Sequence, residues 1–222
     1  MARDWHAWHQ EYDDPGSSLA QRLTVVRGEV CRALEWLEAA GRTAPRLLSL
    51  CAGDGRDTLA VLASDHRDVH ATLVELDADF AEAARSEAAR LGLERVEVRT
   101  ADAGTTDSLA GAGPADVLLA CGIFGNISVD DMRATVQALP TLLATDGVVI
   151  WTRGRRQHPD DPADRSVAGD EPAEQVRDAF VGAGFEEVGF VRPEQADYRV
   201  GVHRLVGDPL PFQPGRRLFR FR

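Results

Sequence analysis

The sequence contains no lysine, and all 25 of its basic residues are arginine. A Walker-type phosphate loop, a pyridoxal Schiff base and a lysine nucleophile each need a lysine side chain, so all three are excluded. Acidic residues are in excess and give a net charge of −11. Nucleic-acid binding needs a basic face that neutralises phosphates, so this charge argues against a nucleic-acid partner. Arginine in place of lysine, with abundant alanine, also indicates a GC-rich bacterial genome.

Cysteine is scarce, and long apolar runs are absent. Cys31, Cys51 and Cys121 have no metal-ligand spacing, and each lies in or near an element that we expect to be buried. We therefore expect reduced thiols, no metal and a cytoplasmic protein. No apolar run approaches the roughly 18 residues that span a bilayer, and the polar, aromatic N-terminus is unlike a signal peptide. We expect no membrane partner.

The most informative stretch is LLSLCAGDGRD, residues 47–57. An apolar run ends there in a small-residue turn around Gly53 and Gly55, and a helical pattern follows. A buried strand that enters a helix through a tight glycine turn leaves backbone N–H groups facing one point, which suits a nucleotide-like ligand. A second apolar run ends in Glu75, which is placed to accept hydrogen bonds from ribose hydroxyls. Together these features predict an adenosine-containing cofactor.

Apolar runs alternate with amphipathic helical patterns along the chain. Helices are predicted over residues 17–40, with Ser18 and Gln21 as a capping box, and over 79–91. This alternation predicts one domain with a parallel sheet that helices cover on both faces. Residues 154–169 lack apolar periodicity and are expected to form a surface loop or lid. The tail GRRLFRFR is expected to form a final edge strand.

The turn from Cys51 to Gly55 resembles motif I of the class I S-adenosylmethionine-dependent methyltransferases, with Cys51 in the place of the first glycine. An Asp-Ala pair after the third run, and the stretch 121–126 after the fourth, resemble later landmarks of that family. The resemblance covers roughly residues 17–206. It implies an α/β, Rossmann-like, seven-stranded, mostly parallel sheet with helices on both faces and a C-terminal antiparallel hairpin. Residues 1–16 would then be an N-terminal lid segment and residues 17–222 the methyltransferase domain.

The same resemblance implies S-adenosyl-L-methionine as the cofactor and a set of residues that bind it. Glu75 would hold the ribose, Asp102 would face the adenine amine, and the backbone at Cys121 would border the methyl group. The cofactor-binding residues implied in this way are Tyr12, Ala52, Gly53, Gly55, Glu75, Leu76, Asp102, Ala103, Cys121 and Gly122.

Two regions are candidates for binding the methyl acceptor. Near the N-terminus, Trp5, Trp8, His9 and Tyr12 recur at helical spacing, so they form either a lid over the cofactor or a hydrophobic staple. After the fifth strand, arginines are either solvated charges or a clamp for an anionic acceptor. The predicted substrate-binding residues are Trp8, Phe124, Arg153 and Arg155.

A hydroxyl or amine acceptor must lose a proton, which a histidine with a pKa near neutrality can remove, whereas a carboxylate acceptor needs no base. His203 on the last predicted strand is the favoured candidate, because a strand positions a base rigidly, and His9 is the second. The sequence thus predicts methyl transfer to an oxygen or nitrogen atom of a small molecule such as a secondary metabolite.

Two other functions stay open. A nicotinamide-dependent oxidoreductase would share the strand–turn–helix start, although Thr58 stands where its fingerprint needs a small residue. A non-catalytic partner protein that binds S-adenosylmethionine would carry the same cofactor landmarks.

Overall fold

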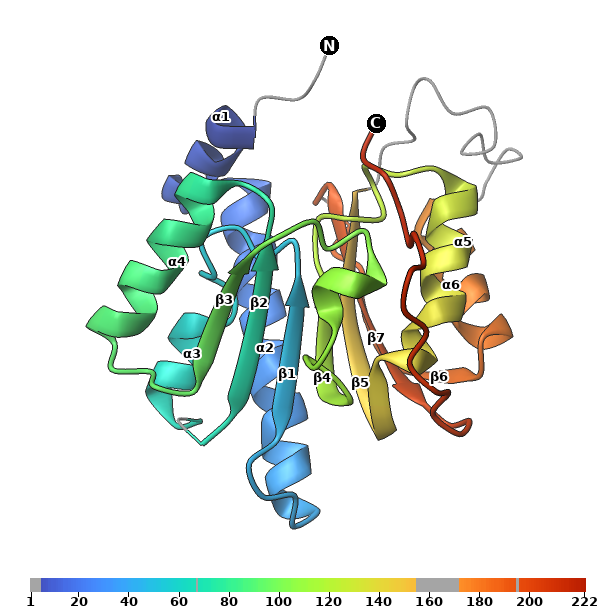
Figure 1. Ribbon diagram of the computed structural model, residues 1–222. Coiled ribbons are helices and arrows are strands. Elements are labelled where there is room, and N and C mark those ends of the chain that lie inside the picture. Colours follow the sequence, from blue (N-terminus) through green and yellow to red (C-terminus); the bar gives the residue numbers. More distant parts are fainter. Residues whose placement is uncertain (1–4, 67, 155–171, 195) are drawn as a thin grey trace.

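The computed structural model describes residues 5–66, 68–154, 172–194 and 196–222. Seven strands in these ranges form one sheet in the order β3-β2-β1-β4-β5-β7-β6 (Figure 1). Neighbours among β1 to β5 pair in parallel, and β7 is antiparallel to both β5 and β6. The predicted fold class, with its C-terminal antiparallel hairpin, is confirmed. The strands are β1 (Arg46–Leu50), β2 (His70–Glu75), β3 (Val96–Thr100), β4 (Ala115–Ala120), β5 (Leu143–Gly154), β6 (Phe185–Val191) and β7 (Tyr198–Leu205).

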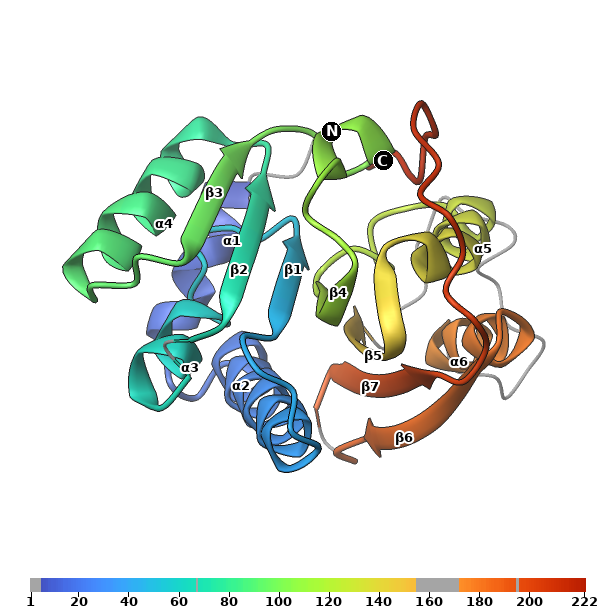
Figure 2. The same ribbon diagram turned by 60° about the horizontal axis from the view of Figure 1, so that its bottom comes forward.

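Helices cover both faces of the sheet (Figure 2). One face carries α5 (Val129–Ala138) and α6 (Pro172–Gly182), and the other carries α2 (Ser18–Ala39), α3 (Leu59–Ser64) and α4 (Ala78–Arg90). Successive residues of a strand alternate between the two cores, as the pleat requires. Leu48 and Leu118 belong to the α5–α6 side, whereas Leu47 and Val117 belong to the α2–α4 side. No helix in the described ranges is long and apolar enough to span a bilayer.

Capping side chains fix where the helices begin. Asp77 accepts hydrogen bonds from the N–H groups of Asp79 and Phe80, which starts α4 directly after the second strand. Ser128 accepts from the N–H of Asp131 and starts α5. At α2 the cap is Ser17, whose hydroxyl accepts from the N–H of Ala20, so the predicted capping box at Ser18 is displaced by one residue.

The C-terminal tail, residues 206–222, is not the predicted edge strand. It runs past η2 (Thr106–Leu109) and α5 to the carboxyl edge of the sheet (Figure 1). The predicted strand is the stretch GRRLFRFR, residues 215–222, but its N–H groups donate to side chains and loop carbonyls and not to a neighbouring strand. Gly215 donates to Asp107, Arg216 to Thr106 and Leu218 to Gly104. An isolated bridge joins Thr105 to Arg217. The expected loop at 154–169 lies outside the described residues, apart from Gly154.

Two leucines of the tail differ in burial, which gives a direct test of its packing. Leu218 exposes 2% of its surface and Leu210 exposes 49%. Leu218→Ala should lower the free energy of unfolding by ~2–5 kcal/mol, because it leaves a cavity in the core. Leu210→Ala should change it by less than ~0.5 kcal/mol. Urea denaturation measures both, and equal losses would show that the tail is not packed as described.

Candidate functional site

A cavity of about 410 Å³ lies at the carboxyl ends of β1, β2 and β4. In this strand order β1 lies between β2 and β4, which makes this edge the switch point where open α/β sheets bind ligands. Three groups of residues line it. The turns after the strands contribute Cys51, Ala52, Gly53, Asp54, Arg56, Asp57, Glu75, Leu76, Asp77, Cys121 and Gly122; the helices contribute Leu23 and Phe80; the chain ends contribute Trp8, His9, Tyr12 and Phe221.

Glu75 ties the first two turns together at the floor of this cavity. Its Oε2 accepts the N–H of Gly53 at 2.8 Å, and its Oε1 accepts the N–H of Asp77 at 2.8 Å. A carboxylate oxygen can accept two hydrogen bonds, so each oxygen keeps capacity for a further donor. Glu75 lies where the resemblance placed a ribose ligand.

The glycine turn leaves no room for side chains. Gly53 and Gly55 have φ angles of +57° and +73°, which favour glycine. A Cβ at Gly55 would lie 2.8 Å from a side-chain carbon of Leu73 and 2.9 Å from one of Leu59. Gly55 therefore packs against β2 and α3, while Gly53 and Ala52 line the cavity itself.

The two residues that the resemblance placed beside the adenine lie elsewhere, and their contact with adenine stays a prediction. Asp102 and Ala103 do not line the cavity. The Oδ1 atom of Asp102 accepts the N–H of Gly104 at 2.8 Å, and its Oδ2 accepts the guanidinium of Arg217 at 2.5 Å. Ala103 exposes 3% and packs in the core. Asp102 therefore anchors the C-terminal tail, which the sequence did not indicate. Leu76, by contrast, lies at the rim with 65% of its surface exposed.

The turn after β4 forms the opposite side of the cavity. The N–H of Gly122 donates to Thr152 Oγ1 at 2.8 Å, and its carbonyl accepts the side-chain amide of Asn126 at 2.7 Å. Cys51 packs with the core under α5 and Cys121 with the core under α2, so the two thiols lie on opposite faces of the sheet. Burial raises the pKa of both thiols, which keeps them protonated and unreactive at neutral pH.

Trp8, His9 and Tyr12 all line the cavity, as the lid interpretation expects, whereas the side chain of Trp5 lies outside the described residues. The three lining residues come from α1 (Trp5–Gln10) and η1 (Glu11–Asp13). The ring of His9 stacks on Phe80 at 4.2 Å, and Trp8 meets Tyr12 edge-on at 5.8 Å. The phenol oxygen of Tyr12 accepts the guanidinium of Arg22 at 2.6 Å. Opening and closing of this segment as a lid stays a prediction.

Of the two predicted bases, only His9 is brought to the cavity. Burial lowers the pKa of His9, so its imidazole is neutral at pH 7 and able to accept a proton. His203 has no exposed surface; it stacks on Phe180 at 4.4 Å, and Nε1 of Trp151 donates to its Nδ1 at 3.0 Å. Burial lowers the pKa of His203 to about 4. The favoured role of His203 as a base is therefore corrected, because α6 covers its face of β7 and it serves packing.

Of the predicted substrate-binding residues that the structure describes, one lines the cavity and two do not. Trp8 lines the cavity, but Phe124 exposes 3% of its surface and packs edge-on against Trp151 and Phe180. Arg153 exposes 6% and lies beside Gly125, away from this cavity. Arg155 lies outside the described residues.

Sequence reasoning missed several lining residues. Asp57 follows the glycine turn, and burial raises the pKa of its carboxyl. Arg56 pairs with Asp54 through two guanidinium nitrogens, and its charge lies 4.6 Å from the ring centre of Tyr12. Asp54, Arg56 and Asp57 could have been predicted as lining residues, because all three lie in the stretch LLSLCAGDGRD around the glycine turn. Phe221 could not have been predicted, because its stretch resembled a strand.

Comparison with known proteins agrees with this geometry. Residues 48–149 match the model of a family described as methyltransferase domain. This stretch of the chain is therefore similar to a methyltransferase domain. No curated protein matches the sequence.

Solved structures share the fold of this chain at low sequence identity. Magnesium protoporphyrin IX methyltransferase from Synechocystis PCC 6803, with bound SAM, is 14% identical at a TM-score of 0.61 and covers 92% of each chain. An O-methyltransferase family protein from Burkholderia thailandensis is 18% identical at a TM-score of 0.61, covering 89% of this chain and 57% of its own. The cyclase SpnF is 18% identical at a TM-score of 0.55, covering 77% of each chain.

The tight packing of the glycine turn predicts a difference between two substitutions to alanine. Gly55 and Gly41 have similar φ angles, +73° and +77°, but a Cβ at Gly41 would meet nothing within 4 Å. Gly55→Ala should therefore lower the free energy of unfolding by ~1–3 kcal/mol more than Gly41→Ala, the added cost being overpacking against Leu73 and Leu59. Thermal and urea unfolding measure the difference. Equal costs would leave only backbone strain and contradict the packing described here.

Proposed function

We propose that this protein is an S-adenosyl-L-methionine-dependent methyltransferase that transfers a methyl group to an oxygen or nitrogen atom of a small molecule. The observation that carries the proposal is Glu75, which binds the N–H of Gly53 at the floor of the cavity and keeps acceptor capacity toward it. The matching domain family and the bound SAM of the Synechocystis protein support the same cofactor.

The residues present fit this cofactor. Glu75 would accept the two ribose hydroxyls, and the exposed Leu76 would cover one face of the adenine. The glycine turn would border the amino-acid part, and Gly122 with Cys121 would border the sulfonium. When bound, S-adenosylmethionine supplies an electrophilic methyl group. The protein then has to align an acceptor lone pair with it and exclude water, which the aromatic N-terminal segment over the cavity can do.

We assign proton removal from the acceptor to His9. Its ring lies over the glycine turn, since a Cβ built at Gly53 would be 2.7 Å from His9 Cε1. Its lowered pKa keeps it in the neutral form that accepts a proton. The clamp for an anionic acceptor has less support. Arg153 lies away from the cavity, and Arg56, which lines it, is already paired with Asp54. We therefore favour an uncharged acceptor. We also propose, from the sequence composition, that the enzyme is bacterial and cytoplasmic.

The structure supports the two alternative functions to different degrees. A nicotinamide-dependent oxidoreductase is disfavoured, because a dinucleotide-binding sheet ends in a sixth parallel strand where this sheet has the antiparallel β7. A protein that binds the cofactor without transferring its methyl group is the second candidate. The cyclase SpnF, which shares the fold, is the observation that favours it.

Removing one acceptor from Glu75 should weaken cofactor binding. Glu75→Gln keeps the shape of the side chain but replaces one carboxylate oxygen by a donor, which would face a ribose hydroxyl or a backbone N–H. Calorimetry with S-adenosylhomocysteine should show affinity lower by at least ~tenfold, as expected for the loss of a charge-assisted hydrogen bond. Glu97→Gln, on the exposed face of β3, is the control. Equal affinity in both variants would remove Glu75 from the cofactor site.

A base with a lowered pKa predicts a particular pH profile. His9 must be neutral to accept a proton, so turnover should stay constant as the pH falls to 6.5, the usual pKa, and decline only below it. With a hydroxyl or protonated amine acceptor, His9→Ala should lower kcat by ~10²–10⁴-fold. His70→Ala, at an exposed position on β2, should leave kcat unchanged. Near-full activity of His9→Ala across pH 6 to 9 would exclude the imidazole base.

A further inference from the structure

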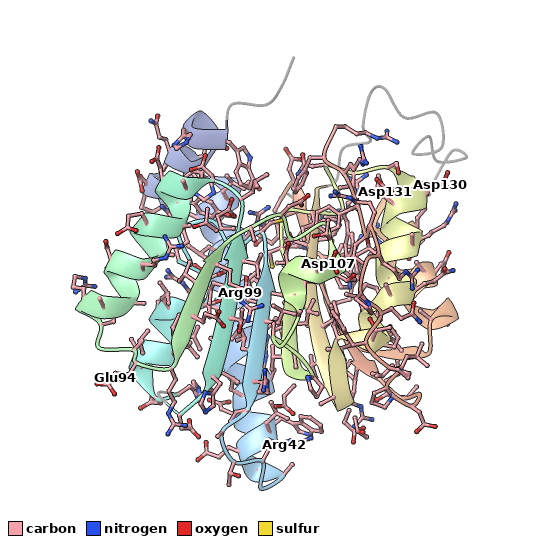
Figure 3. All side chains as sticks on the ribbon, in the orientation of Figure 1. Arg42, Glu94, Arg99, Asp107, Asp130 and Asp131 are labelled. Atoms are coloured by element: carbon pink, nitrogen blue, oxygen red, sulfur yellow. The ribbon has the colours of Figure 1, made fainter. Side chains whose placement is uncertain are left out.

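The last eight residues of the tail are held along their length by specific contacts. The N–H of Arg216 donates to Thr106 Oγ1 at 2.9 Å, and the N–H of Thr106 donates back to the carbonyl of Arg216 at 3.0 Å. Two carboxylates labelled in Figure 3, Asp107 and Asp131, accept the N–H groups of Gly215 and Arg220 at 2.8 and 3.1 Å. The tail is thus a fixed part of the domain and not a loose end.

Arg217 adds the contact closest to the sheet edge. Its guanidinium pairs with Asp102 after β3, while the next residue, Leu218, donates its N–H to the carbonyl of Gly104 at 2.8 Å. Phe219 exposes 1% of its surface and lies in the core. These contacts fix the backbone two residues before Phe221.

Phe221 differs from its buried neighbour because its ring lines the cavity. Phe221 exposes 40% of its surface in total, and its ring meets that of Phe219 edge-on at 5.6 Å. The next N–H, of Arg222, donates to the carbonyl of Asn126 at 3.1 Å, and the amide of Asn126 donates to the carbonyl of Gly122. Phe221 therefore lies on the β4 side of the cavity, whereas Glu75, the proposed ribose ligand, lies on the β2 side.

A second ring reaches the β4 side from the N-terminus. A Cβ built at Gly122 would be 3.9 Å from Cη2 of Trp8. Trp8 and Phe221, which stand at opposite ends of the sequence, thus both border the end of the cavity where the methyl group would be transferred. Flat rings on the walls of a cavity favour a flat, apolar ligand, because stacked or edge-on ring pairs add to the free energy of burial.

Resting on the proposed function, we infer that Phe221 is a specificity-determining residue for the acceptor, and that the acceptor is a planar aromatic molecule whose ring contacts Phe221 and Trp8. Arg217, through its ion pair with Asp102, is a positioning residue that sets where Phe221 lies. The rings select the acceptor by shape and apolar contact, and His9 takes the proton from its hydroxyl or amine group.

The test compares two ligands with the same carbon skeleton, the planar 2-naphthol and its saturated, puckered counterpart decahydro-2-naphthol. Calorimetry is done on the full chain with S-adenosylhomocysteine at saturation. The wild type should bind 2-naphthol at least ~fivefold more tightly than the saturated alcohol. Phe221→Ala, and Phe221→Leu, which keeps apolar bulk without a flat ring, should each reduce this preference to about twofold or less.

Phe212 supplies the matched control, since it exposes 39% of its surface in the same tail and does not line the cavity. Phe212→Ala should keep the preference of the wild type. Arg217→Ala should reduce the preference while the melting temperature stays within a few degrees, and Arg217→Lys should restore part of it. Changes in stability alone would not alter the ratio between the two ligands.

Two results would overturn the inference: wild type that does not bind 2-naphthol in preference to the saturated alcohol, or Phe221→Ala that behaves as Phe212→Ala does. Binding of S-adenosylhomocysteine alone is the separate measurement. All variants should bind it within about twofold of the wild type, because Glu75 is untouched. Failure of the wild type to bind it would contradict the proposed function itself, whereas lost ring preference with intact binding contradicts only the role of Phe221.

Discussion

The carboxylate of Glu75 is the constraint on which the site depends. One oxygen holds the N–H of Gly53 in the first turn, and the other holds the N–H of Asp77 at the start of α4. Asp77 in turn caps α4, and Gly55 packs the first turn onto Leu73 and Leu59. The two turns therefore form one rigid floor, and the acceptor capacity left on Glu75 faces the cavity above it. A floor fixed in this way binds its ligand without first having to order itself.

The walls above this floor come from the two ends of the chain. The N-terminal segment supplies Trp8, His9 and Tyr12, and the tail supplies Phe221. An arginine side chain holds each end in place. Arg22 donates a hydrogen bond to the phenol oxygen of Tyr12 in the N-terminal segment, and Arg217 of the tail forms an ion pair with Asp102. Rings at the walls keep water out of a site whose floor is polar. The same desolvation keeps His9 neutral, so the burial that shapes the cavity also sets the protonation state of its candidate base.

The sequence predicted the fold and the floor of the site well, because both follow from local patterns. A strand that ends in a glycine turn, and an acid at the end of the next strand, are visible in a few residues around Gly53 and Glu75. The errors concern which distant segment covers a given surface. The alternation on β7 places His203 on a face but does not reveal that α6 covers it. Asp102 has the expected position in the chain, yet it does not line the cavity, and an arginine from the tail pairs with it.

The most direct test of the central claim is calorimetric titration of the wild-type protein with S-adenosylhomocysteine and, separately, with NAD⁺. Both cofactors would bind in the same cavity, and neither titration requires the methyl acceptor to be known. We expect saturable binding of one S-adenosylhomocysteine per chain and no binding of NAD⁺ at the same concentrations. Binding of NAD⁺ alone, or of neither ligand, would contradict the assignment of this cavity to S-adenosylmethionine.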